Sequence, residues 1–193
     1  MYQRLLGDAR LYLLLERFDR ELADSSRKAG CRRCARQLHQ ANYPRKPRGA
    51  ACKLGPEFAR RWSFCCADRE CRRRLTPPSV RFYGSRVYFG VVFVLCMAME
   101  QGLQSGRGQQ LGKLLGVSRQ TLKRWRVYWQ QTFVQTPFWR AARAHLSPPV
   151  EEGELPASLL RRFGVELISS LFMLLRFVAP LSSKSAGPQG GGY

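Results

Sequence analysis

The stretch QQLGKLLGVSRQTLKRWRVYW, residues 109–129, carries the strongest fold signal in this chain of 193 residues. Its apolar residues recur at helical spacing on either side of a short break: Leu111, Leu115, Val117, Leu122 and Trp125. Gly112 is small where two helices would approach each other, Gly116 permits the positive φ of a tight turn, and Ser118 is suited to cap the next helix. The stretch therefore predicts two helices that cross through a turn, a helix-turn-helix.

The second predicted helix has a basic and polar face that suits duplex DNA. In a helix-turn-helix, the second helix lies in the major groove with its first residues at the base edges. The DNA contacts expected here are Ser118, Arg119, Gln120, Lys123, Arg124 and Arg126. Arg119 and Gln120 have the donor geometry for guanine and adenine edges, whereas the three later cations suit phosphates. The alternative is a helical hairpin whose basic face is only solvated.

Helical patterns also precede this stretch. Within an N-terminal segment of residues 1–29, residues 2–27 are expected to form one amphipathic helix, with these apolar residues at helical spacing: Leu11, Leu15, Phe18 and Leu22. The apolar run 85–101 has the β-branched content of a buried strand, but it is too long for one and ends in CMAMEQ. We therefore expect a buried helix there.

The remaining helices form a domain and a C-terminal region. The buried helix, the helical pair and a short helix over 137–145 are expected to make a trihelical helix-turn-helix domain over 85–146. Residues 147–156 contain three prolines and three glutamates, a composition typical of a linker. An amphipathic helix is predicted over 157–180, and the polar, glycine-rich residues 181–193 are expected to be disordered.

Seven cysteines, most of them close together in the sequence, give the second signal. Cys31 and Cys34 flank two residues, so one tight turn would supply two thiolates to a metal ion. Three more cysteines follow after about thirty residues, a separation like that of the two hairpins in a zinc ribbon. The expected zinc ligands are Cys31, Cys34, Cys66 and Cys71, and Cys65 stays open as a replacement for Cys66. Four thiolates would leave no open position on the ion, so its role would be structural.

The zinc ribbon is expected to span residues 30–80 and to end at the Pro77-Pro78 pair. In a reducing compartment, clustered cysteines are better explained by metal than by disulfides. The alternative is ordinary reduced thiols, as expected for Cys52 and Cys96. His39 could substitute as a ligand, although a loop histidine beside a metal knuckle is more often a bystander. The expected fold class is mainly α with a small zinc β-ribbon, followed by the trihelical domain.

The distribution of charge indicates a polyanionic partner. The formal net charge of +20 would destabilise a compact monomer by self-repulsion unless a polyanion bound it. Residues 27–86 carry 17 Lys and Arg against three acidic residues, and residues 107–143 carry eight and no acidic residue. These two stretches contain the two motifs, so charge and motif agree. Further DNA contacts are expected from the ribbon: Arg45, Lys46, Arg48, Arg72, Arg73 and Arg74.

The order of these motifs resembles a family of bacterial zinc-ribbon and helix-turn-helix proteins related to transposases. The likeness covers residues 29–165 and is carried by CRRC (31–34), NYPRKPRG (42–49), RWSFCCADRECRRRLTPPSVRFYGSRVYFG (61–90) and LGKLLGVSRQTLKRWRVYW (111–129). The resemblance implies a DNA-binding component or regulator of a mobile element, acting with a transposase or recombinase. In this chain Arg32 and Arg33 occupy the first knuckle, where ribbons often have small or turn-forming residues.

A catalytic role is not expected. Two-metal strand transfer needs three converging carboxylates, but Glu100 is the only acidic residue between positions 72 and 150. The next ones lie in the predicted linker: Glu151, Glu152 and Glu154. Tyr83 and Tyr88 lie near arginines, as a recombinase nucleophile would, although aromatic residues beside a Pro-Pro turn more often serve packing.

Other interpretations stay open. RNA is the alternative partner, because Arg-rich loops with Tyr43, Trp62 and Tyr83 would suit stacking on unpaired bases; a fragment of a catalytic subunit is the third. The longest apolar run, 87–99, is too short to span a bilayer, and the start of the chain mixes charges unlike a signal peptide. We therefore expect a cytoplasmic, nucleoid-associated protein with no membrane partner, whose amphipathic terminal helices offer apolar faces to a homodimer.

Overall fold

The computed structural model describes residues 2–84, 86–100 and 107–183. Most of the described residues are helical. The α-helices are α1 (Tyr2–Gly7), α2 (Ala9–Lys28), α3 (Gly90–Ala98), α4 (Arg107–Leu114), α5 (Arg119–Val127), α6 (Pro137–Arg143), α7 (Ala157–Phe163) and α8 (Leu167–Val178). Short helical turns are η1 (Pro56–Ala59), η3 (Tyr128–Thr132), η4 (Phe133–Gln135), η5 (Glu152–Glu154) and η6 (Ala179–Ser182).

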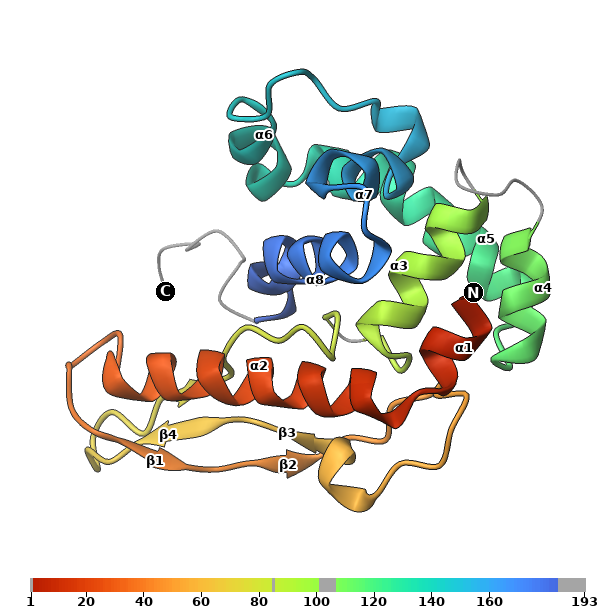
Figure 1. Ribbon diagram of the computed structural model, residues 1–193. Coiled ribbons are helices and arrows are strands. Elements are labelled where there is room, and N and C mark those ends of the chain that lie inside the picture. Colours follow the sequence, from red (N-terminus) through yellow and green to blue (C-terminus); the bar gives the residue numbers. More distant parts are fainter. Residues whose placement is uncertain (1, 85, 101–106, 184–193) are drawn as a thin grey trace.

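Two small antiparallel sheets accompany these helices. The strands are β1 (Leu38–Gln40), β2 (Tyr43–Pro44), β3 (Arg60–Arg61), β4 (Phe64–Cys66) and β5 (Arg74–Leu75). One sheet has the order β1-β4-β5 and the other pairs β2 with β3. In Figure 1 the long helix α2 separates these strands from the helices that follow them in the chain. The fold is therefore mainly α with a small antiparallel β part, as the sequence predicts.

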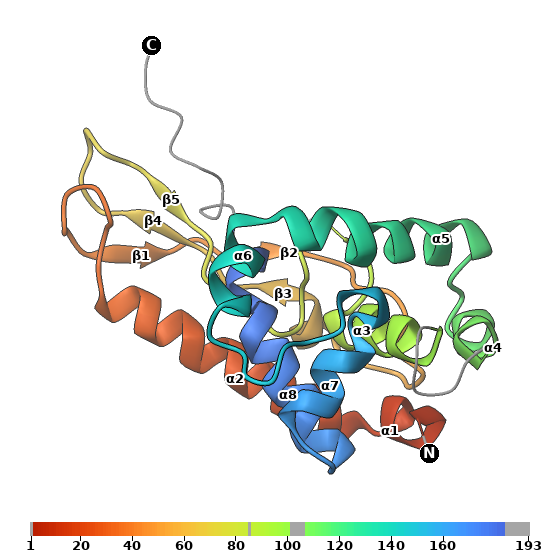
Figure 2. The same cartoon turned by 90° about the horizontal axis from the view of Figure 1, so that it is seen from above.

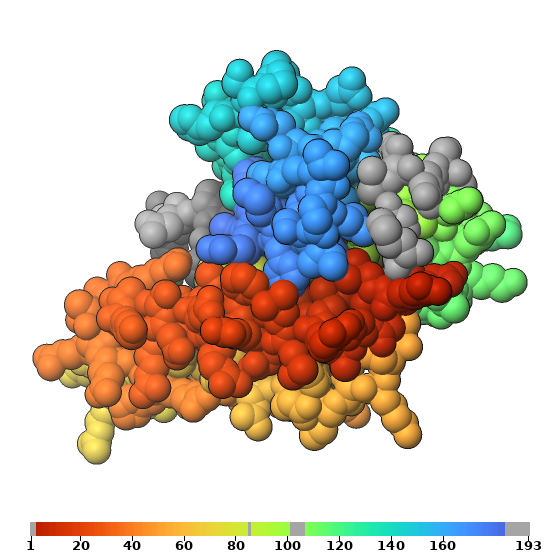
Figure 3. All heavy atoms as spheres, viewed as in Figure 1, coloured from red at the N-terminus to blue at the C-terminus, as the bar shows by residue number. Residues whose placement is uncertain are grey.

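The N-terminal segment is two helices, not the single helix expected over residues 2–27. The chain breaks at Asp8, whose carboxylate accepts a hydrogen bond from the Arg10 backbone N–H and so caps α2. The break directs α1 toward the helical body, where Leu6 is fully buried and its carbonyl accepts a bond from the Tyr12 hydroxyl. Figure 3 shows α2 along one face of the molecule with the C-terminal helices resting against it.

Helix α3 forms the centre of the helical body. All of its residues are buried, which confirms the prediction of a buried helix, although it begins five residues later than expected. The preceding residues are extended, since Tyr88 pairs with Arg48 and Phe89 pairs with Phe82. The Phe93 ring in α3 packs between Trp125 and Trp129, with ring centroids 5.2 Å from each.

Helices α4 and α5 occupy the stretch from which the helical pair is predicted. Gly116 has a φ of +67° in the turn between them, and the Ser118 Oγ accepts a bond from the Thr121 N–H, which caps α5. A Cβ at Gly112 would lie 2.9 Å from the Leu122 Cδ1, so the close approach of the two helices favours glycine there. Helical structure continues without a break from α5 through η3 and η4 to Gln135, as Figure 2 shows along one side of the molecule.

The C-terminal region also differs from expectation. The predicted helix 157–180 is divided into α7 and α8, which are bent by 112° at Gly164, a residue with a φ of +146°. The predicted linker 147–156 packs against the helices: Leu155 is fully buried, and the Trp139 Nε1 donates to the Glu152 carboxylate at 2.7 Å. Of the tail expected over 181–193, residues 184–193 lie outside the described part of the chain.

One large hydrophobic core joins segments that the sequence assigned to separate units. It contains residues of α1, α2, α3, α4, α5, α6, α7 and α8. A second, much smaller cluster lies among the strands: Ala23, Cys31, Leu38, Phe64, Cys66 and Leu75. The helical part therefore folds around a single core, and the ribbon has few apolar contacts of its own.

A buried ion pair connects these two parts. Asp19 of α2 and Arg81 are both fully buried, and the Arg81 Nε donates to the Asp19 carboxylate at 2.8 Å. The same carboxylate accepts from the Ser79 hydroxyl at 2.6 Å and from the Val80 N–H at 2.7 Å. The remaining Arg81 nitrogens donate to the Phe58 and Arg60 carbonyls. Both charges are thus fully paired and hydrogen-bonded, as burial requires.

Among the described residues, no single helix is both long and apolar enough to cross a bilayer. Helices α7 and α8 reach the required length and composition only as a bent pair.

The buried ion pair gives a stability prediction. Asp19→Asn leaves the Arg81 guanidinium buried without its counter-charge, and we expect the free energy of unfolding to fall by about 3–5 kcal/mol. Chemical denaturation followed by circular dichroism measures this change. Asp24→Asn, at an exposed position of the same helix, is the control and should change stability by less than about 0.5 kcal/mol. Equal effects of the two substitutions would contradict the assignment.

Candidate metal centre and basic surfaces

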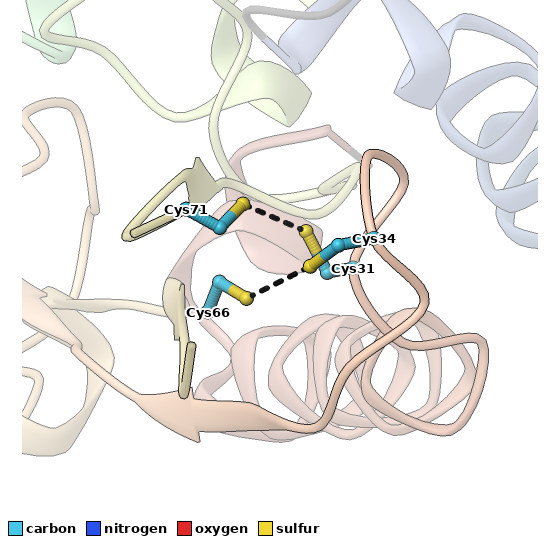
Figure 4. Close-up of side chains that lie close together, drawn as sticks. All are labelled: Cys31, Cys34, Cys66 and Cys71. Carbon is cyan, nitrogen blue, oxygen red and sulfur yellow. Dashed lines mark hydrogen bonds between the residues drawn. The ribbon is translucent and has the colours of Figure 1, made fainter. Parts of the chain in front are cut away.

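Four cysteines from two separate parts of the chain meet beside the end of α2. The sulfur atoms of Cys31, Cys34, Cys66 and Cys71 all lie within 4.8 Å of one another. The Cys31 and Cys71 sulfurs are 3.7 Å apart, and the Cys34 and Cys66 sulfurs are 3.4 Å apart. Figure 4 shows the four side chains pointing toward one another. These are the four residues that the sequence selects as its first choice of ligands.

The first pair of cysteines is held by a tight turn directly after α2. Gly30 has a φ of +75°, and a Cβ there would lie 2.9 Å from the Ala35 carbonyl, so the chain can reverse at this point only with glycine. The Cys31 N–H donates to the Arg36 carbonyl at 2.9 Å, and the Ala35 N–H donates to the Cys31 carbonyl at 2.8 Å. The two arginines inside the turn, Arg32 and Arg33, are exposed and do not disturb it.

The second pair is separated by four residues because a side chain shapes the loop between its members. The Asp68 carboxylate accepts from the backbone N–H groups of Glu70 and Cys71, each at 2.9 Å. The chain then turns through Arg72, which has a φ of +40°, and the Cys66 N–H donates to the Arg73 carbonyl at 2.9 Å. This closed loop returns Cys71 to the cluster. The wide spacing is therefore compatible with a metal knuckle.

Cys65 lies outside the cluster. It precedes Cys66 in β4, and neighbouring residues of a strand point to opposite faces of the sheet. Cys66 is paired with Leu38 and faces the small core, whereas Cys65 is paired with His39 on the outer face, where its thiol donates to the Arg72 carbonyl at 3.5 Å. The strand register therefore directs the Cys66 side chain, and not that of Cys65, toward the other three cysteines. Neither Cys65 nor His39 belongs to the group of residues that could hold a metal ion.

The geometry and chemistry of the four thiols fit a metal ion. Tetrahedral ligands at the metal–sulfur distance of about 2.3 Å are about 3.8 Å apart, close to the separations observed here. The backbone N–H groups of Arg33 and Cys34 lower the pKa of the Cys31 thiol to about 6. Burial instead raises the pKa of the Cys66 thiol to about 12. A cation bonded to the sulfurs would favour the thiolate form at all four positions.

Exposed arginines surround the cysteine cluster. They come from both cysteine loops and from β5: Arg32, Arg33, Arg36, Arg69, Arg72, Arg73 and Arg74. The predicted contacts Arg72, Arg73 and Arg74 are therefore available to a partner, and Arg74 lies next to Cys65 in the register of the sheet. The four additional arginines were not selected from the sequence, although their positions inside or beside the cysteine pairs were a usable signal. Positive charge here also favours a tetrathiolate centre, which carries net negative charge.

In the basic loop, one of the three predicted contacts is bonded within the chain. Arg45 is half-buried, and its guanidinium donates to the carbonyls of Gly84 and Arg86 at 2.8 and 2.6 Å while lying over the Phe82 ring. Burial lowers its pKa. These bonds use the side chain to hold two segments of the chain together, and a DNA contact at Arg45 stays a prediction. Lys46 and Arg48 are exposed, as a contact requires.

The DNA contacts predicted on α5 lie in one exposed region, and only Arg126 among them forms an ion pair within the described residues. Arg119, Gln120, Lys123 and Arg124 are exposed, and the Ser118 hydroxyl is engaged in the helix cap. Arg126 is ion-paired with the almost completely buried carboxylate of Glu100. A cavity of about 220 Å³ lies along this side of α5, lined by Glu100, Gln109, Arg119, Leu122, Lys123 and Arg126. Arg126 is thus committed to an intramolecular partner that the sequence did not indicate.

The aromatic and acidic residues considered for catalysis or RNA stacking make contacts within the protein. Tyr83 is buried, its hydroxyl lies 2.7 Å from that of Tyr128, and burial raises its pKa far above the ordinary value. The Tyr88 hydroxyl donates to the Gly116 carbonyl at 2.9 Å, next to the turn between α4 and α5. Tyr43 and Trp62 are half-buried. Two of the acidic residues expected in a linker are ion-paired, Glu152 with Arg143 and Glu154 with Arg161.

Comparison with protein-family models, with curated proteins and with solved structures gave no match. The resemblance to zinc-ribbon and helix-turn-helix proteins of mobile elements accordingly stays a prediction from the sequence motifs.

The cluster gives a prediction about bound metal. Cys71→Ser should lower the metal content of the purified chain from one ion to a small fraction of that value, because one of four ligands is lost. Cys65→Ser is the matched control and should leave the metal content unchanged. Elemental analysis of both variants beside the unsubstituted chain makes the comparison. Loss of metal from the Cys65 variant, or retention by the Cys71 variant, would contradict the ligand set.

Proposed function

We propose that this protein binds duplex DNA through a helix-turn-helix formed by α4 and α5, that the four cysteines hold a structural zinc ion, and that the chain is not itself an enzyme. The observation that carries the proposal is the exposed face of α5, which presents Arg119, Gln120, Lys123 and Arg124 with no acidic residue between positions 107 and 143. Such a face suits a polyanion that also offers hydrogen-bond acceptors on its base edges.

Zinc is the metal that best suits four thiolates from two tight turns. A tetrahedral site of four cysteines is typical of structural zinc, and it leaves no open position at which water could be activated. The cysteines belong to a cluster with only a few apolar residues: Ala23, Leu38, Phe64 and Leu75, with Trp62 at its edge. So small a core supplies little free energy of folding, and the ion would supply the rest.

The geometry of α4 and α5 supports the helix-turn-helix assignment. The turn with positive φ at Gly116, the cap at Ser118 and the close contact of Gly112 with Leu122 together fix how the two helices cross. Arg119 and Gln120 begin α5, the part of a recognition helix that reaches base edges. Lys123 lies one turn further along, where a cation suits a phosphate. Arg126 contributes to the orientation of this face through Glu100.

The ribbon would add sequence-independent contacts. The arginines around the cysteines form a basic surface at a distance from α5, as Figures 1 and 2 both place the cysteine loops and the helical pair at opposite ends of α2. Phosphate contacts there would raise affinity without reading sequence. Arg48 lies elsewhere, because it pairs with Tyr88, whose hydroxyl donates to the Gly116 carbonyl in the turn before α5. The biological setting that we propose, from the resemblance in the motifs, is a regulator or accessory protein of a mobile element, acting beside a transposase or recombinase.

The proposal predicts affinity for duplex DNA with a steep dependence on salt. Lys123→Ala should weaken binding to every duplex alike and lower the magnitude of the slope of log affinity against log salt by about 0.9. Arg119→Ala should instead reduce the discrimination between preferred and random duplexes, by about 1–3 kcal/mol. Arg17→Ala, on the exposed face of α2, is the control and should do neither.

Fluorescence anisotropy with selected and random duplexes at several salt concentrations measures these effects, with single-stranded RNA of equal length as a competitor. Stronger binding to the RNA than to any duplex would replace the proposed function by RNA binding. The Arg119 and Lys123 substitutions could instead weaken the affinity for selected and for random duplexes by the same amount. That result would contradict the assignment of Arg119 to base edges and of Lys123 to a phosphate.

A further inference from the structure

The exposed face of the long helix that begins with α5 extends well beyond the residues predicted to touch DNA. Helical structure runs from Arg119 through η3 and η4 to Gln135. Successive residues of a helix advance by about 100°, so four exposed residues share one side of it: Gln120, Arg124, Val127 and Gln131. We call this side the crest of the helix. The buried residues Leu122, Trp125 and Trp129 lie on the opposite side and fix which way the crest faces.

The crest residues are free to meet a partner. No hydrogen bond or ion pair within the described residues involves the side chains of Gln120, Arg124 or Gln131. By contrast, Arg126 on the flank is paired with Glu100, and Gln135 at the end of the helix accepts a bond from Arg140 at 2.7 Å. Within the described part of the chain, Arg126 and Gln135 are therefore engaged in intramolecular contacts, and the side chains of Gln120, Arg124 and Gln131 are not.

The crest presents amide, guanidinium and apolar side chains, each of which suits a different base edge in the major groove. Glutamine can pair with both polar groups of adenine in the major groove, arginine can pair with both acceptors of guanine, and a small apolar group can contact the methyl group of thymine. Val127 is the apolar member, and its side chain is 42% exposed. A single exposed valine is ordinary on a protein surface. Here it lies in line between side chains suited to base edges.

We propose that the crest extends the surface that reads the DNA sequence beyond Arg119 and Gln120, with Val127 against the methyl group of a thymine and Gln131 against a base pair nearby. The inference rests on the proposed function, and it moves Arg124 from the phosphates to the bases. Val127 and Gln131 are about one helical turn apart, a distance comparable with about two base-pair steps of 3.4 Å. The two residues therefore read positions within about two base pairs of each other.

Deoxyuridine tests this inference, because it differs from thymidine only in lacking the methyl group that Val127 would contact. The first step is selection of bound sequences from random duplex DNA by the unsubstituted chain. Each thymine of the selected site is then replaced in turn by deoxyuridine. We expect one replacement to weaken binding about fourfold, the value of one buried methyl group.

Val127→Ala should abolish the effect at that one position. Val165→Ala, at a fully exposed position outside the helix, is the matched control and should retain the effect. Gln131→Ala should relax the preference at a position within about two base pairs of that thymine. Because both crest substitutions are at exposed sites, thermal unfolding and metal content should match the unsubstituted chain.

The possible results distinguish a failure of this inference from a failure of the proposed function. If the chain selects a duplex sequence but no thymine shows the effect, or if Val127→Ala retains it, the crest does not read the site and duplex binding still stands. If the chain binds no duplex even at low salt, the proposed function fails and the inference fails with it.

Discussion

The buried pair of Asp19 and Arg81 is the interaction on which the arrangement of the whole molecule depends. Helix α2 leads directly into the first cysteine loop, and the segment that contains Arg81 follows the second loop and β5. The bonds of Asp19 to Ser79, Val80 and Arg81 therefore connect both ends of the cysteine-containing part to one helix. An unpaired charge at this depth would be strongly destabilising, so the two segments are held in one relative position.

The cysteine-containing part and the helical part differ in how much apolar surface they bury. The helical body buries a continuous set of apolar side chains around α3, and aromatic rings from α5, η3 and α6 extend that core. The unit with the cysteines has only a small cluster of apolar residues and depends on four sulfur atoms and on loops closed by backbone bonds. The buried ion pair joins the two parts, together with Phe58 and Val80, which belong to the large core.

The arginines of this basic chain fall into groups with different roles. Arg61 and Arg81 are buried and bond to backbone carbonyls, and Arg61 has its pKa lowered mainly by burial. Arg45 is held by carbonyl bonds, and Arg86 lies 3.9 Å from the centre of the Tyr128 ring. Other arginines are exposed, and those on α5 and around the cysteines lie in the two predicted motifs. The net charge of +20 therefore overstates what a partner can meet, and the position of each charge matters more than the sum.

The sequence alone determined the features that depend on residues close together in the chain. The two cysteine pairs, the turn at Gly116 and the apolar stripe of α4 and α5 were predictable, because turn geometry and helical periodicity are local properties. Only the tertiary structure shows that Cys66 and not Cys65 joins the sulfur cluster, and that Arg45 is bonded to backbone carbonyls. Burial and desolvation depend on segments that are distant in sequence, and Asp19 and Arg81 are 62 residues apart. For the same reason the single core that joins the terminal helices was visible only in the folded chain. The helix breaks at Asp8 and Gly164 have local causes, a side-chain cap and a glycine with positive φ, which the regular spacing of the apolar residues concealed.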